Sequence, residues 1–169
     1  MAAQRNTNFS LDSDHPGPIR QELGEIDKRG RLHLPTQLIQ SISWLKGASH
    51  SVDALAILEE PGRIKISDWN TASLPVLERR KELINDLNRR QDDDVIEALR
   101  LIEDRYKKIR IPSDLRPTIN NYLMLHLELS PENESKIYIV SVSDNLIVMS
   151  SDYRNAKLLN FSTFLPDLP

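Results

Sequence analysis

The stretch Asp27-Lys-Arg-Gly-Arg-Leu-His-Leu-Pro35 has a near copy further along the chain, Asp104-Arg-Tyr-Lys-Lys-Ile-Arg-Ile-Pro112. In both, an aspartate is followed by basic residues, then by two alternating aliphatic residues and a closing proline. A constant offset of 77 positions relates the two stretches, and Leu38 and Leu115 fall on the same offset. An internal repeat defines the architectural unit of a fold. The sequence therefore predicts a duplicated unit with a basic strand in each copy.

The first repeat, residues 21–70, is predicted to contain an extended strand, a short helix and a β-hairpin. Leu38, Ile42 and Leu45 are spaced for one buried helical face. Glu60-Pro61-Gly62 favours the hairpin turn, because glycine adopts a positive φ at low cost. The expected elements are an extended segment (22–34), a helix (36–44) and two hairpin strands (54–58 and 63–67).

The second repeat, residues 103–153, is predicted to have the same order of elements. A basic extended segment leads into a helix over 113–125, and Asp144-Asn145 provides the hairpin turn. The hairpin strands are expected at 137–142 and 146–149.

Residues 71–102 are predicted to form an αα-hairpin that links the repeats, since apolar residues recur there at three- and four-residue spacing. Asp92-Asp93-Asp94 indicates the start of the second helix, where carboxylates cap free amides and suit the helix dipole. Outside the repeats we expect a flexible arm over 1–20 and a tail over 154–169.

A single repeat of about 50 residues buries too little apolar surface to offset its chain entropy comfortably. Two copies that interleave their hairpins share one core and remove this difficulty. The sequence therefore predicts an α+β fold in which two tandem β-α-β-β units form one barrel-like body with pseudo-twofold symmetry.

Composition excludes several classes of protein. The 169 residues include no cysteine, which excludes disulfides, zinc–thiolate sites and thiol catalysis. No apolar run is long enough to span a membrane, and the polar N-terminal segment is not a secretory signal. We expect a cytoplasmic protein without a cofactor or a membrane partner.

Positive charge gathers in the two repeated stretches, although the formal net charge of the chain is −3. Strand alternation predicts that Leu32 and Leu34 point inward while Arg31 points outward, and that Lys108 and Arg110 do the same in the second copy. A basic surface contributed by both copies favours binding of double-stranded DNA. A solvated strand edge is the alternative reading. The candidate DNA-binding residues are Lys28, Arg29, Arg31, Arg105, Lys107, Lys108 and Arg110.

The pattern Asp27-Lys-Arg-Gly-Arg31, followed by Leu-His-Leu-Pro35 and a short helix, resembles the AbrB/MraZ superfamily of swapped-hairpin DNA-binding proteins. Two tandem copies joined by a helical pair are similar to the MraZ family in particular. The resemblance covers about 21–153. It implies a sequence-specific transcriptional regulator, associated with the nucleoid, that places the Asp-x-x-x-Arg segment of each half against DNA and assembles into homo-oligomeric rings.

The second copy departs from this pattern, since Lys108 stands in place of arginine and Lys107 in place of Gly30. Arginine binds a guanine edge through two parallel hydrogen bonds, whereas lysine acts as a point charge. The second copy is therefore expected to bind phosphate rather than to read bases, or to have diverged in function.

Two other classes of function are alternatives to DNA binding. A protein-interaction module that keeps the fold without binding DNA, such as an antitoxin-like or assembly partner, fits the negative net charge; its candidate contacts are Asp12, Asp14, Phe161, Phe164 and Leu165. An enzyme is not expected. The four histidines lack metal-ligand spacing, and no phosphate-binding glycine loop or nucleophile elbow is present.

Overall fold

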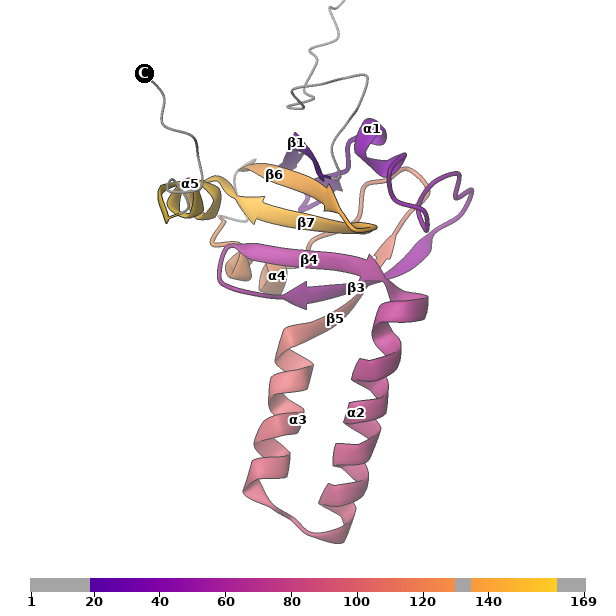
Figure 1. Ribbon diagram of the computed structural model, residues 1–169, viewed down its shortest axis with the longest axis vertical. Coiled ribbons are helices and arrows are strands. Elements are labelled where there is room, and N and C mark those ends of the chain that lie inside the picture. The colour runs from indigo at the N-terminus through magenta and orange to yellow at the C-terminus, as the bar shows by residue number, and fades with distance from the viewer. Residues whose placement is uncertain (1–18, 130–134, 161–169) are drawn as a thin grey trace, which may run out of the picture.

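Seven antiparallel strands form one curled sheet, a half-barrel, in the computed structural model, which describes residues 19–129 and 135–160 (Figure 1). Their order across the sheet is β2-β1-β6-β7-β4-β3-β5. The strands are β1 (Ile19–Ile26), β2 (Leu32–His33), β3 (Val52–Leu58), β4 (Arg63–Asp68), β5 (Tyr106–Ile111), β6 (Ser135–Val142) and β7 (Asn145–Ser150). The predicted α+β class and both predicted β-hairpins are confirmed.

The described residues also form five helices. They are α1 (Thr36–Ile39), α2 (Trp69–Arg89), α3 (Asp93–Arg105), α4 (Asn121–His126) and α5 (Ser151–Asn160). Helices α2 and α3 form the predicted αα-hairpin, which projects away from the sheet (Figure 1). Asp92 caps α3 by accepting a hydrogen bond from the amide of Asp94, as the aspartate run predicts. None of the described helices is both long and apolar enough to cross a bilayer.

Each leading strand pairs with the hairpin of the other unit. Strand β1 pairs with β6, where Leu23 lies opposite Tyr138. Strand β5 pairs with β3, and the two hairpins meet where β4 pairs with β7. Each leading strand therefore depends on the other unit for its pairing with a hairpin.

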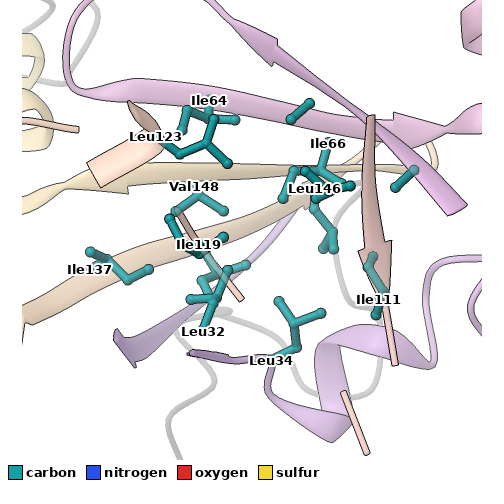
Figure 2. Packing of buried hydrophobic residues seen from close by; sticks show 14 of the residues in the cluster. Leu32, Leu34, Ile64, Ile66, Ile111, Ile119, Leu123, Ile137, Leu146 and Val148 are labelled. Atoms are coloured by element: carbon teal, nitrogen blue, oxygen red, sulfur yellow. The ribbon is translucent and has the colours of Figure 1, made fainter. Parts of the chain in front are cut away.

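One hydrophobic core lies inside the curl (Figure 2). Alternation along the strands directs the aliphatic side chains to this inner face. Both units contribute fully buried residues, among them Ile26, Leu32, Ile66, Ile111, Leu123, Ile137 and Leu146. Helices α1 and α4 add Leu38, Leu123 and Met124 to the same core.

The structure relates the two units by an offset of 85 rather than 77. Ile26 and Ile111 each end a leading strand and are each followed by a turn. In the two turns, Gly30 donates to the carbonyl of Asp27 and Leu115 donates to that of Pro112, both at 2.9 Å. Gly30 and Leu115 also share a positive φ, 75° and 60°. Residues 27–35 are thus equivalent to 112–120, not to 104–112.

This difference moves several predicted boundaries. The match at 77 aligned a turn and strand of the first unit with a helix end and strand of the second, because both carry basic residues before alternating aliphatics. The second unit begins at β5, and the helical hairpin extends over 69–105. Residues 113–119 are a turn and an extended segment, so the predicted helix over 113–125 is shortened to α4. Residues Ile19 and Arg20, predicted to lie in the arm, begin β1. The remainder of the arm and the end of the tail, including Asp12, Asp14, Phe161, Phe164 and Leu165, lie outside the described residues.

Candidate nucleic-acid interface

The turn after β1 is held by its own backbone. Asp27 donates to the carbonyl of Arg31 at 3.0 Å and accepts from the amide of Gly30 at 2.9 Å. Gly30 has a φ of 75°, a conformation that side chains disfavour. A Cβ at this position would also lie 3.1 Å from the carbonyl oxygen of Ile119. Glycine is therefore favoured here both by the conformation of the turn and by the close approach of the second unit.

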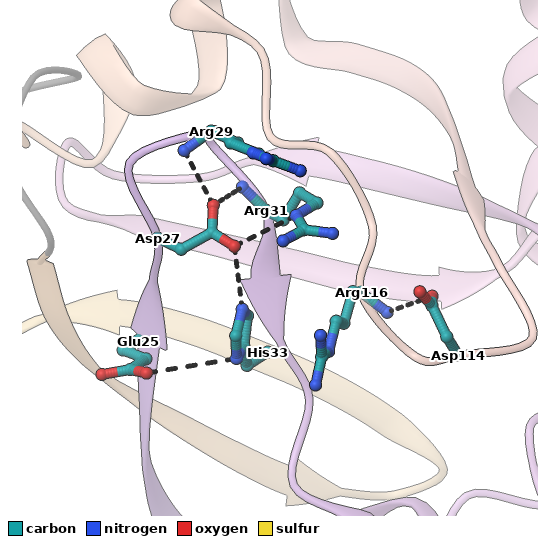
Figure 3. Close-up of polar contacts among 7 residues, drawn as sticks. All are labelled: Glu25, Asp27, Arg29, Arg31, His33, Asp114 and Arg116. Carbon is teal, nitrogen blue, oxygen red and sulfur yellow. Dashed lines mark hydrogen bonds and ion pairs between the residues drawn. The ribbon is translucent and has the colours of Figure 1, made fainter.

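The Asp27 carboxylate is the centre of the turn (Figure 3). Its Oδ1 accepts from the amides of Arg29 at 2.9 Å and Arg31 at 3.1 Å. Its Oδ2 accepts from Arg31 Nε at 3.0 Å and lies 2.9 Å from His33 Nε2. The hydrogen bond with His33, with the backbone amides and the Arg31 charge, holds the pKa of Asp27 well below its usual value. An ionised Asp27 thus fixes both the loop and the base of the Arg31 side chain.

Three predicted cations lie in or beside this turn. Lys28 and Arg29 are exposed at its tip. The Arg31 side chain is about one-third exposed, at 32%. Asp27 takes only Nε, and among the described residues the terminal nitrogens of Arg31 have no partner within hydrogen-bonding distance. The guanidinium is therefore oriented while its outer edge is available for a ligand.

The segment after the first turn pairs with the segment after the second. Leu34 donates to the carbonyl of Leu115 at 3.1 Å, and Ile119 donates to that of Gly30 at 2.6 Å. These two hydrogen bonds exchange under the 85-residue offset, so they are equivalent about a pseudo-twofold axis. Arg31 and Thr118 form a β-bridge between the same segments. The two turns therefore lie next to each other, although they are far apart in sequence.

Arg116 occupies the position equivalent to Arg31, and sequence reasoning did not select it as a contact. It is exposed, and its amide donates to Asp114 Oδ1 at 3.1 Å (Figure 3). The second turn lacks the restraint found in the first, since Pro112 and Thr118 replace Asp27 and His33. The signal that could have found it is Asp114-Leu-Arg116, two positions after the proline that follows a strand.

The predicted cations of the second unit lie elsewhere. Lys108 and Arg110 point outward from β5, as alternation predicts, with exposures of 52% and 72%. Both approach the carboxylate of Asp53, at 3.7 and 3.5 Å. Lys108 also lies over the ring of Trp69 at 4.6 Å. These two residues flank the sheet edge rather than the turn.

Arg105 and Lys107, the other two candidate DNA-binding residues of the second unit, lie in α3 and β5. Arg105 ends α3 and its guanidinium lies 6.0 Å from the ring centre of Tyr106. Lys107 belongs to β5 and alternates with Lys108, so its ammonium lies over Tyr122 at 4.5 Å. Its ammonium also donates to the carbonyl of Glu103. Neither residue joins the cluster at the turns.

Within the described ranges, no three histidine, aspartate or glutamate side chains are grouped as metal ligands. A comparison with models of known protein families finds no match, and a comparison with curated proteins finds no significant similarity.

Proposed function

We propose that this chain is a sequence-specific DNA-binding regulator of transcription that contacts double-stranded DNA through its two paired turns. The observation that carries the proposal is that Arg31 and Arg116 occupy equivalent positions on two segments hydrogen-bonded to each other. Lys28 and Arg29 extend the same basic surface, which we call the turn surface.

A two-stranded β-ribbon fits the major groove of B-DNA, which is about 12 Å wide. Arginine is suited to guanine there because its planar fork donates two parallel hydrogen bonds. Arg31 is pre-oriented by Asp27, so it is assigned to base reading. Arg116 lacks an equivalent carboxylate, and we assign it, with Lys28 and Arg29, to phosphate contacts. Arg105, Lys107, Lys108 and Arg110 add to the field that attracts DNA.

The pairing of each leading strand with the other unit's hairpin supports the swapped-hairpin arrangement of the AbrB/MraZ superfamily. The motif from Asp27 to Pro35 forms a turn and strand β2, and the short helix α1 follows it, which supports the same resemblance. By the same resemblance we propose a homo-oligomer, with a ring as one form, located at the nucleoid in the cytoplasm.

A selection from random duplexes tests the proposal. We expect an enriched sequence whose binding weakens about tenfold or more between about 50 and 300 mM salt. R31A should weaken the enriched duplex roughly tenfold or more while changing nonspecific binding much less. R116A should weaken both duplexes alike and lower the salt slope by about 1. R79A on the exposed face of α2 is the control and should leave both unchanged. Failure to enrich any duplex, or salt-independent binding, would refute the proposal.

A protein-interaction module is the second candidate, and the α2–α3 hairpin favours it. The hairpin exposes large apolar side chains with little cover from other described elements: Leu74 (62%), Leu77 (45%), Ile96 (46%) and Leu101 (58%). Such side chains are typical of contact surfaces when they gather on one element. Absence of retention on heparin, together with a protein that co-purifies and is lost in L74S/L101S, would select this candidate.

A further inference from the structure

Strand β5 has an open edge. Within residues 19–129 and 135–160, β3 is the only strand paired with Lys107–Ile111. In an antiparallel pair every second residue directs its N–H and C=O away from its partner. Such an edge is a template on which another extended chain can form hydrogen bonds.

The two units differ at this edge. In the first unit, β2 covers the end of the equivalent strand β1, with Glu25 opposite His33 and Ile26 opposite Leu32. Under the 85-residue offset, residues 32–34 correspond to 117–119, which are not assigned to a strand paired with β5. These two segments pair with each other instead, since Leu32 donates to the carbonyl of Pro117 at 2.8 Å. The end of β1 is therefore covered by a strand of its own unit, whereas the end of β5 is not.

A groove of about 390 Å³ runs beside this edge, and we call it the cationic groove. It is lined by Lys108, Ile109, Arg110, Pro112, Thr118 and Asn120. The first unit has an equivalent groove of about 350 Å³, lined by Leu23, Gly24, Glu25, His33, Leu34 and Pro35. Five residue pairs of the two linings are related by the offset of 85. The two units thus have grooves of similar volume at equivalent places, and their chemistry differs.

The divergence changes the charge of the groove. Lys108 replaces Leu23 and Arg110 replaces Glu25, so an apolar and acidic wall has become a basic one. Asp53 is the carboxylate paired with both cations, and it offsets only part of their charge. The groove therefore suits an acidic ligand.

The open edge distinguishes a polypeptide from a nucleic acid. A peptide backbone offers alternating donors and acceptors that match those of a strand edge, whereas a phosphate backbone offers acceptors alone. Ile109 and Pro112 give the groove apolar surface that can contact alternate side chains of an added strand.

We propose that the β5 edge and the cationic groove bind an extended acidic polypeptide segment, which adds to the sheet as an eighth strand. Its backbone pairs with Lys107–Ile111, and its carboxylates lie against Lys108 and Arg110. The site adjoins the turn surface at Thr118 but includes none of its cations, so variants of those cations test it independently of DNA binding.

The test uses the full chain and a labelled peptide of about ten residues with alternating glutamate and valine. We expect saturable binding that K108A/R110A weakens by about tenfold or more. R79A/R100A removes the same charge from exposed positions on α2 and α3 and should change binding less than about twofold. A peptide methylated at alternate backbone nitrogens keeps its charge and loses strand donors, so it should bind at least about tenfold more weakly. Amide hydrogen exchange of 107–111 should slow when the unmodified peptide binds.

Three results would overturn the proposal. Equal binding of the methylated peptide would mean charge attraction without strand addition. Unchanged exchange of β5 amides at saturation would place the peptide elsewhere. Loss of peptide binding in R31A/R116A, together with displacement of the peptide by duplex DNA, would mean that the groove belongs to the DNA surface. Retained peptide binding in R31A/R116A supports the proposal, whether or not the chain binds DNA.

Discussion

The turn after β1 and the turn after β5 share a backbone path but are held by different means. In the first, one carboxylate joins two backbone amides, a guanidinium and an imidazole. In the second, Asp114 accepts a hydrogen bond from the backbone amide of Arg116, and Leu115 adopts the conformation that glycine adopts in the first. The comparison teaches that duplication preserved the pairing of the two turns while only one arginine kept a rigid support.

The largest effect concerns the core residues that end the two leading strands. Ile26 and Ile111 are 0% and 1% exposed at equivalent positions of one shared core. We expect I26A and I111A each to lower the free energy of unfolding by about 2–5 kcal/mol, measured by urea denaturation. I19A, at an exposed position of β1, should cost less than about 0.5 kcal/mol. A small cost for only one of the two core variants would contradict the shared core.

The second prediction separates the two arginines by chemistry rather than by charge. R31K keeps the charge but loses the planar fork, so it should weaken binding to the selected duplex by roughly 5- to 50-fold. R116K should change this affinity less than about threefold, because a phosphate contact needs only the charge. Fluorescence anisotropy at one fixed salt concentration measures both. Equal losses in the two variants would remove the distinction between the turns.

The third prediction concerns the residues with positive φ. G30A should lower the free energy of unfolding by about 1–2 kcal/mol, because it adds a side chain to a left-handed conformation beside the Ile119 carbonyl. L115G relieves the same conformational cost but removes a side chain packed against the core. Thermal unfolding should therefore show a smaller loss for L115G than for G30A. The reverse order would show that the two turns are not equivalent.

The two turns also show how much of the structure can be predicted from the sequence. The repeat, the two hairpins, the helical pair and a shared core follow from hydrophobic spacing and from the small size of one unit. The position of the second turn does not follow, because basic residues before alternating aliphatics also occur in β5. Arg116 was missed for that reason. Leu115 in a left-handed conformation carries no local sequence signal, since tertiary pairing with Leu34 and not residue preference holds it there.

The fourth and smallest effect is on the pH dependence of stability, which should differ between two carboxylates of the first unit. The folded pKa of Asp27 is lowered, so its contribution to stability is present above the unfolded value of about 3.9 and is lost as pH falls below it. D27N should therefore lose less stability than the unsubstituted chain as the pH falls through the acid range. Thermal melts between about pH 2 and pH 8 measure this slope.

Glu22 should behave in the opposite way. It is 5% exposed, and burial raises its folded pKa. Ionisation then costs stability as pH rises through the unfolded value of about 4.3. E22Q should have the same melting temperature as the unsubstituted chain at low pH and a higher melting temperature at a pH of about 7. E78Q, at an exposed position of α2, should show no such difference. A lower melting temperature for E22Q at neutral pH would contradict the sign.

Contact between both paired turns and DNA is the central claim, and an NMR titration tests it most directly. The isotope-labelled chain would be titrated with the duplex enriched by selection. We predict that backbone amide shifts change most at 28–31 and 114–118 together, with the resonances of the α2–α3 hairpin unchanged. Changes confined to the hairpin, or to the first turn without the second, would contradict the account.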